Sequence, residues 1–333
     1  MKPNLFDFAT SELSQDAFLA WLLSWADADC KAEDPILHDC ARDVIRLFIS
    51  SRYEDMGDFS HVTLSRQVEH IDVLMKIDQE YVVVIEDKTT TSQHSGQLER
   101  YAQAIAQSDL RNLKPVYVYF KTGLESERTR SGIEEKGYTV ICRDQLLAIF
   151  SKYSSNNAIY ADYVAYLQSL EEEAEAFHSL PYPEWDWETW HGFYRFMDKC
   201  LMDKDWAYVS NPSGGFLGFW WHFQPWKDGV QAYLQLEQDV LCFKIALDDL
   251  NPDCDKAEYR NEMYQILMQQ AEKEGRMEIH KPARFGYGTY MTVAVVDAKD
   301  WLGSEDKPVD LDAVVARLHD YEQFLTNCLT VTN

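Results

Sequence analysis

Apolar and polar positions in the first half of the chain follow helical periods in some segments and strand periods in others. From Phe18 to Trp25, apolar residues recur at helical spacing, so we predict a helix that begins near Glu12 and is capped by Ser11 or Thr10. Residues 80–88 (EYVVVIEDK) include a run of β-branched residues that is typical of a strand buried on both faces. The other elements predicted for this half are helices over 36–51, 93–107 and 144–176, one long bent strand or two strands over 62–77, and strands over 115–120 and 138–142. This order predicts a mixed α/β sandwich.

A boundary between two domains is predicted after the first half. The acidic run Glu171–Glu173 is followed by Pro181 and Pro183, which are typical of a helix end and a linker. We therefore predict one domain over residues 1–176 and a C-terminal α+β domain over 183–333. The elements predicted for the second domain are helices over 187–202, 256–274 and 311–329, and strands over 207–210, 216–223, 230–236, 240–247 and 290–296.

The charge of the chain limits the kinds of partner it can bind. Its 333 residues include 31 basic and 56 acidic residues, a net charge of −25. Residues 1–150 contain 16 basic and 25 acidic residues, and the remaining residues contain 15 and 31. This balance argues against tight nonspecific binding of nucleic acid, which needs a basic surface. A nucleic-acid enzyme is still compatible with it, if the polyanion enters a locally neutralised groove or arrives with a metal ion or a partner.

Composition also bears on location. No apolar run reaches the roughly 18 residues that a membrane span needs, and Met1–Asn4 leads into no apolar segment of the kind found in secretory signals. The seven cysteines are scattered and form no C-x-x-C pair, which disfavours a structural zinc site and a disulfide framework. We therefore expect a protein of the reducing cytoplasm that has no membrane association.

Two acidic residues and a lysine are predicted to meet at one edge of the sheet. Side chains alternate along a strand, so Glu86 and Lys88 share one face and Asp87 points away. If the segments on either side of residues 78–79 pair as a hairpin, Asp72 lies near Glu86. Two neighbouring carboxylates repel each other, and a divalent cation such as Mg²⁺ removes that conflict. The alternative is an exposed strand end with ordinary solvated charges, because a Glu-x-Lys pattern is common.

These residues, in this order, resemble the PD-(D/E)xK nuclease superfamily. That family has an acidic residue on its first helix, an Asp that opens one strand and a (D/E)-x-K motif on the next strand. Here the corresponding residues are Glu12, Asp72 and Glu86–Lys88. The segment 11–23 is also similar to the opening of a bacterial family within this superfamily. The resemblance extends over residues 5–150 and implies a restriction-endonuclease-like mixed sheet flanked by helices.

The resemblance implies a role for each residue of the motif. Asp72 and Glu86 would be metal ligands, with the backbone carbonyl of Asp87 as a third. Lys88 would assist the attacking water, and Glu12 would complete or orient the metal site. The implied cofactor is Mg²⁺, with Mn²⁺ as a substitute.

A further pair follows the motif on the next predicted helix. Gln97 and Tyr101 lie four residues apart and therefore on one face of that helix. Their spacing resembles the Gln-x-x-x-Tyr signature of the RecB-like branch, which implies that they position the substrate backbone or the lysine. The alternative is that one lies on the helix surface and the other in the core.

Several positions have alternatives that the sequence leaves open. Glu12 could be a first-turn glutamate that interacts with the helix dipole, and Asp16, one turn later, is its rival for the metal site. Ile71 stands where the family has a proline before the aspartate. His70 and His94 could touch a substrate, but we favour structural roles for both.

Aromatic residues are concentrated in the second half. Seven of the ten tryptophans lie between Trp185 and Trp226, and residues 219–226 read FWWHFQPW. One interpretation is a stacking platform for unpaired bases. The other is a sheet packed by aromatic side chains, which we favour because residues 151–250 contain 6 basic and 16 acidic residues.

Together these patterns predict a Mg²⁺-dependent phosphodiesterase with a C-terminal domain that recognises substrate or a partner. The resemblance implies that the substrate is nucleic acid, with DNA favoured, and that the setting is bacterial or phage genome defence or repair. The alternative is a non-catalytic or assembly-dependent module of the same fold, whose acidic surface binds a protein partner or mimics DNA.

Overall fold

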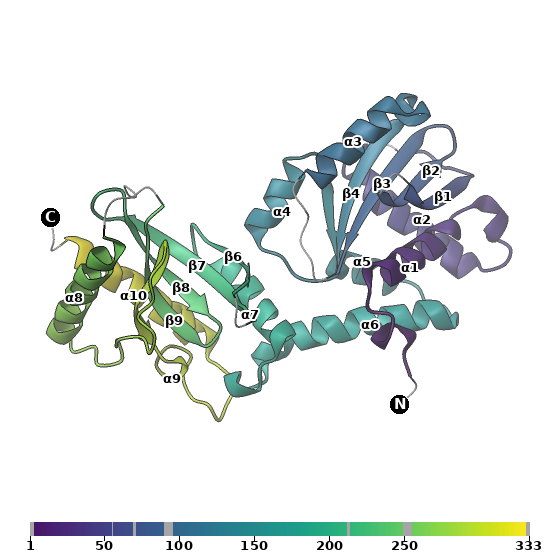
Figure 1. Cartoon of the computed structure of the whole chain (residues 1–333). Coiled ribbons are helices and arrows are strands. Elements are labelled where there is room, and N and C mark those ends of the chain that lie inside the picture. The colour runs from purple at the N-terminus through teal and green to yellow at the C-terminus, as the bar shows by residue number, and fades with distance from the viewer. Residues whose placement is uncertain are drawn as a thin grey trace. The chain divides into compact units, whose positions relative to one another are not determined.

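The computed structural model describes residues 3–54, 56–68, 71–89, 96–211, 214–248 and 255–330. His70 and His94 lie outside these ranges, so the structure does not address them. The chain divides into two compact units, Met1–Leu124 with Thr129–Glu172 and Glu125–Arg128 with Glu173–Asn333 (Figure 1).

The first unit is built on a five-stranded mixed sheet. In spatial order its strands are β1 (Val62–Val68), β2 (Ile71–Ile77), β3 (Tyr81–Lys88), β4 (Lys114–Lys121) and β5 (Thr139–Cys142). The first three are antiparallel neighbours, whereas β3, β4 and β5 run parallel. The predicted mixed sheet is confirmed, and the segment 62–77 consists of two strands. A tight turn with Asp78 at φ 49° joins β2 to β3 and pairs Ile77 with Tyr81.

Helices cover both faces of this sheet (Figure 1). Val83 and Ile85 of β3 pack into the core formed with the first, second, fifth and sixth α-helices, whereas Val82 and Val84 pack toward Tyr101 of the third. The helices are α1 (Glu12–Ser24), α2 (Pro35–Ser50), α3 (Gln97–Gln107), α4 (Glu127–Glu134), α5 (Arg143–Phe150) and α6 (Ala158–Glu175). Every residue of β3 is buried, which agrees with its run of β-branched residues.

Two features of the first half differ from the sequence prediction. Helix α4 was not predicted, because in its sequence ERTRSGIE only Ile133 is buried and no apolar period is visible. The single helix predicted over 144–176 is wrong, because a break at residues 151–157 separates α5 from α6. Asn157 precedes the first residue of α6 and caps it, because its side-chain Oδ1 accepts a hydrogen bond from the backbone N–H of Ile159 at 3.0 Å.

The second unit contains an antiparallel five-stranded sheet with helices packed against it (Figure 1), which confirms the predicted α+β organisation. In spatial order the strands are β10 (Tyr290–Val296), β9 (Val240–Ala246), β8 (Gln231–Glu237), β7 (Phe216–Pro225) and β6 (Asp205–Val209). The helices are α7 (Trp187–Cys200), α8 (Lys256–Glu274), α9 (Ala298–Trp301) and α10 (Leu311–Thr330). Phe219 of β7 packs on Tyr194 of α7, and Phe243 of β9 packs on Phe324 of α10.

The aromatic run on β7 divides between the two faces of this sheet. Phe219 and Trp221 are fully buried on the helix-covered face, where Trp221 Nε1 donates a hydrogen bond to Glu322 at 2.8 Å. The packing interpretation is therefore confirmed for these two residues. Trp220 and Phe223 remain partly exposed on the other face.

The described residues bear on two further features, membrane-spanning helices and the state of the cysteines. Among them, no helix is long and apolar enough to span a membrane. The cysteines described in the structure, at positions 30, 40, 142, 200, 242 and 328, are in the reduced thiol form.

Candidate active site

The β2–β3 hairpin brings two acidic residues together, as the sequence predicts. Val73 pairs with Ile85, and the next step of this register places Asp72 opposite Glu86. The backbone N–H of Asp87 donates a hydrogen bond to Asp72 Oδ2 at 3.0 Å, which fixes the Asp72 carboxylate against the neighbouring strand. Glu86 has no exposed surface, whereas Asp72 is half-buried.

Burial and a nearby negative charge make Glu86 a weak acid. Desolvation, followed by the charge of Asp72, raises the pKa of Glu86 to about 7. Lys88 Nζ forms an ion pair with Glu86 Oε1 and also donates a hydrogen bond to the Asp87 carbonyl oxygen at 3.1 Å. Burial alone would lower the pKa of Lys88, but the hydrogen bond and charge of Glu86 outweigh burial and raise it. Lys88 is therefore held as an ammonium ion.

Glu12, the first residue of α1, reaches the same strand end. Its Oε2 lies 3.8 Å from Lys88 Nζ, and its Oε1 accepts a hydrogen bond from the backbone N–H of Thr89 at 3.5 Å. About a third of its side chain is exposed (34%), so it lies at the rim of the cluster. The structure thus brings Glu12, Glu86 and Lys88 together, and Lys88 lies between the two carboxylates.

A second polar network lies on the opposite face of β3 and involves residues that the sequence analysis did not single out. Gln15 Nε2 donates a hydrogen bond to Asp87 Oδ1, and Tyr163 OH donates one to Gln15 Oε1 at 3.5 Å. Burial raises the pKa of Asp87 well above its usual range despite the hydrogen bond from Gln15. The sequence does contain one signal, because Gln15 is a polar residue one turn after Glu12 on the helix face that carries the apolar residues.

Asp16, the rival of Glu12, has a different environment. It is 1% exposed, and its Oδ2 accepts a hydrogen bond from Gln67 Nε2 at 3.2 Å. Burial, followed by the charge of Asp72, raises the pKa of Asp16 to about 6. Glu12 therefore contacts the lysine of the motif, whereas Asp16 contributes to the acidic network around Asp72 and Asp87.

The predicted pair on α3 also lies at this cluster. Gln97 Nε2 donates a hydrogen bond to Tyr101 OH at 2.7 Å. Burial raises the pKa of Tyr101 to about 12, and the charges of Glu86 and Asp72 contribute to the rise. Tyr101 is therefore a neutral phenol close to both carboxylates, and its partner Gln97 lies at the N-terminal end of the helix.

The oxygen atoms at the end of the β2–β3 hairpin include candidate ligands for a metal ion. Within the described ranges, no three His, Cys, Asp or Glu side chains gather closely enough to hold a metal ion on their own. Asp72, Glu86 and the main-chain oxygen of Asp87 nevertheless form a set of hard oxygen donors, and in the described structure Glu86 Oε2 accepts no hydrogen bond. Such a set fits Mg²⁺, which usually takes one or two protein carboxylates and fills its remaining positions with water and phosphate oxygens.

Comparison with known proteins agrees with this arrangement. A family model described as the PD-(D/E)XK nuclease superfamily matches residues 3–182, more than half of the chain. The matched region includes the β2–β3 hairpin and α3. No curated protein and no solved structure matches the chain.

Proposed function

We propose, from the premise that the chain belongs to the PD-(D/E)XK nuclease superfamily, that it is a Mg²⁺-dependent phosphodiesterase that hydrolyses nucleic acid, with DNA as the preferred substrate. The observation on which this rests is the convergence of Asp72, Glu86 and Lys88 at one end of the β2–β3 hairpin, with Glu12 beside the lysine. Family membership alone implies a nuclease. The cation, the DNA substrate and a role in bacterial genome defence or repair are our proposals.

The metal ligands in this proposal are Asp72, Glu86 and the backbone carbonyl of Asp87. When bound, Mg²⁺ or Mn²⁺ supplies Lewis-acid stabilisation of the negative charge that develops on the phosphate. The cation also offsets the repulsion between the two carboxylates, which the raised pKa of Glu86 reflects. In its absence, the ammonium group of Lys88 compensates the charge of Glu86.

Lys88 and Glu12 act on the attacking water in this proposal. Because Glu86 keeps Lys88 protonated, the lysine donates hydrogen bonds and stabilises negative charge, and it does not act as a base. The Lys88 ammonium donates a hydrogen bond to the attacking water, which adds to phosphorus and releases a proton to solvent. The bond from phosphorus to the leaving oxygen breaks, that oxygen takes up a proton from solvent, and Lys88 stabilises the charge on the phosphate oxygens. Glu12 holds the Lys88 ammonium from the rim of the site.

Gln97 and Tyr101 are proposed to position the substrate. The raised pKa of Tyr101 keeps its hydroxyl protonated at neutral pH, so it can donate a hydrogen bond to a phosphate oxygen. Gln97 Oε1 is buried and, in the described structure, has no hydrogen-bond partner, so it can accept a bond from the substrate or from Lys88. Tyr101 lies near the Glu86 and Asp72 carboxylates, and Gln97 is hydrogen-bonded to Tyr101.

The two domains are proposed to have separate functions. We assign catalysis to a domain over residues 1–176 and recognition of substrate or of a protein partner to a domain over 183–333. The free thiols of the described cysteines support a cytoplasmic location. Because residues 1–150 have an excess of nine acidic residues, we expect divalent cations to assist DNA binding as well as catalysis.

One observation favours a second candidate function. The net charge of −25 suits a module that binds a basic protein or that cleaves only within a larger assembly. In that case the acidic surface, and not the cluster around Glu86, is the functional feature.

The test compares cleavage of single- and double-stranded DNA and RNA by the full chain in millimolar Mg²⁺, in Mn²⁺ and in a chelator. We expect metal-dependent cleavage that falls at least about 100-fold in Asp72→Asn, Glu86→Gln and Lys88→Met. Glu80→Gln is the matched control, because Glu80 lies on the same hairpin but pairs with Lys114 away from the site. Cleavage that survives Asp72→Asn contradicts the proposal, and absence of cleavage together with capture of a basic protein supports the second candidate.

A further inference from the structure

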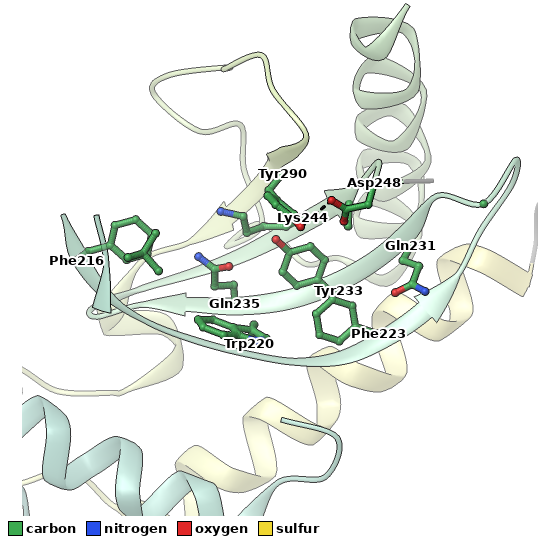
Figure 2. Close-up of a pocket in the computed structure, with 12 residues that line it drawn as sticks. Phe216, Trp220, Phe223, Gln231, Tyr233, Gln235, Lys244, Asp248 and Tyr290 are labelled. Atoms are coloured by element: carbon green, nitrogen blue, oxygen red, sulfur yellow. Dashed lines mark hydrogen bonds between the residues drawn. The ribbon is translucent and has the colours of Figure 1, made fainter. Parts of the chain in front are cut away.

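One face of the β6–β10 sheet in the second unit contains a cavity of about 460 Å³. Figure 2 shows the side chains that line it, rising from the surface of the sheet. We call this surface the pocket face. Its aromatic lining residues are Phe216, Trp220, Phe223, Tyr233 and Tyr290. The helices contact residues of the opposite face, such as Phe219 and Phe243.

A β-bulge on β7 determines which aromatic rings reach the pocket face. Trp221 pairs with Leu234 and Gln224 pairs with Ala232, so two residues of β7 lie opposite Tyr233. One of them, His222, has φ 56°. The other, Phe223, stacks on Tyr233 with ring centroids 4.6 Å apart and an interplanar angle of 11°.

Trp220 is the ring best placed to receive a ligand. Among the described residues, it makes no ring contact with another aromatic side chain, and it is partly exposed. A Cβ atom added to Gly218 would lie 3.2 Å from Phe216 and 3.5 Å from Trp220. The absence of a side chain at this position therefore lets the Phe216 and Trp220 rings lie close against the strand.

Two buried polar side chains form the floor of the cavity. Gln235 is 6% exposed and Lys244 is 9% exposed. Gln235 Nε2 and Lys244 Nζ both donate hydrogen bonds to Glu237 Oε1, at 2.9 and 2.7 Å. This arrangement fixes the orientation of the Gln235 amide, and in the described part of the chain its Oε1 has no hydrogen-bond partner. The floor thus presents an acceptor on Gln235 beside the remaining donors of Lys244.

The charges around the cavity indicate an uncharged ligand. Glu237 neutralises Lys244, and the Asp248 carboxylate accepts a hydrogen bond from Tyr290 OH at 2.7 Å. No excess positive charge is therefore available among these groups for a phosphate. The aromatic walls suit a flat ring, and the adjacent acceptor and donor suit a ring whose edge bears both kinds of group. A nucleobase has both properties.

We propose that this cavity binds a nucleobase that stacks on Trp220 and forms hydrogen bonds with Gln235 and Lys244. The base can belong to a free nucleoside or to an unpaired stretch of nucleic acid. The second source rests on the proposed function, because it would make single-stranded nucleic acid the substrate that this unit recognises.

The test measures binding by calorimetry with the full-length protein in a chelator, so that no cleavage occurs. The probes are adenosine, guanosine, cytidine, uridine and thymidine, followed by short single-stranded oligonucleotides. We expect Trp220→Leu to weaken binding about tenfold, as expected for loss of one stacked base, and Gln235→Leu to change the order of preference among the bases. Trp187→Leu is the matched control, because Trp187 is also partly exposed (39%) but lies on α7, outside the cavity.

Each outcome decides the proposal. Tighter binding of oligonucleotides than of nucleosides supports the nucleic-acid source, and nucleoside binding alone supports a free ligand. Absence of binding, or binding that is the same in wild type, Trp220→Leu and Gln235→Leu, overturns the inference. If the wild type cleaves nucleic acid but binds no base, the cavity proposal is wrong and the proposed nuclease function is still supported. If it binds bases but cleaves nothing, the cavity proposal is supported and the proposed nuclease function is not.

Discussion

At the scale of single residues, the candidate active site is a cluster of carboxyl groups whose negative charges repel one another. Asp72 raises the pKa of Glu86, of Asp16 and of Asp87, in each case after the larger contribution of burial. Lys88 offsets the charge of Glu86, and Arg66 offsets that of Asp16. The metal-free site is therefore expected to reduce the stability of the unit that contains it.

Asp72→Asn is expected to raise the melting temperature of the metal-free protein and to abolish cleavage. Asparagine can still accept the hydrogen bond from the Asp87 amide, but it removes the charge that repels Glu86. Thermal unfolding in a chelator and in millimolar Mg²⁺ checks this. Wild type should gain more stability from Mg²⁺ than the variant does, and a lower melting temperature of Asp72→Asn in chelator would contradict the explanation.

Local rules were enough to predict the site residues on the hairpin, whereas residues whose roles depend on tertiary partners could not be predicted from the sequence. Strand alternation and one hairpin register were enough to bring Asp72 to Glu86. Gln15 could not be assigned a role, because its hydrogen bonds join a helix to a strand 72 positions away and to Tyr163.

At the scale of elements, strongly periodic segments were predicted well and weakly apolar ones were not. Helix α8 and strand β10 have the predicted bounds. Helix α4 was not predicted, because a short polar helix with one buried residue has no apolar periodicity. The parallel pairing of β4 and β5 was a second signal for a helix, since parallel neighbours need a crossover connection. The bulge on β7 could not be predicted from the sequence either, because strict strand alternation would place the Trp220 and His222 side chains on one face of the sheet.

The bulge leads to a prediction about pH. Burial lowers the pKa of His222 below 6.5 despite the nearby charge of Glu322, so the unfolded chain binds a proton more readily than the folded chain does. The contribution of His222 to stability is therefore lost as the pH falls below about 6.5. His222→Asn, which tolerates the left-handed backbone, should reduce the difference in melting temperature between about pH 7.5 and about pH 5.5. An unchanged difference would show that other groups cause the acid sensitivity.

At the scale of the whole molecule, the chain consists of two units, each with its own sheet and its own core. Leu22 is fully buried in the first unit and Leu234 is fully buried in the second. The sequence predicted two domains from a charge run and two prolines, and it could not predict that Glu125–Arg128 would group with the second unit. That grouping depends on contacts distant in sequence, such as the hydrogen bond from the Glu127 amide to Asp198 Oδ2 at 2.7 Å.

Matched core substitutions test whether the units unfold separately. Leu22→Ala and Leu234→Ala each remove a fully buried side chain and are expected to cost about 2–5 kcal/mol. We expect calorimetry of the full chain to show two transitions, with each variant lowering a different one. Mg²⁺ should raise only the transition that Leu22→Ala lowers, and a single transition lowered equally by both variants would contradict this expectation.

The short turn between β2 and β3 has a consequence for how the first unit folds. Contacts between neighbours in sequence form faster than contacts that require a long loop to close, so this hairpin should assemble before the parallel strands β4 and β5 dock. Its assembly brings Asp72 and Glu86 together at the same time. The carboxylates that the proposed nuclease needs would therefore slow an early step of folding, and Asp72→Asn should refold faster than wild type.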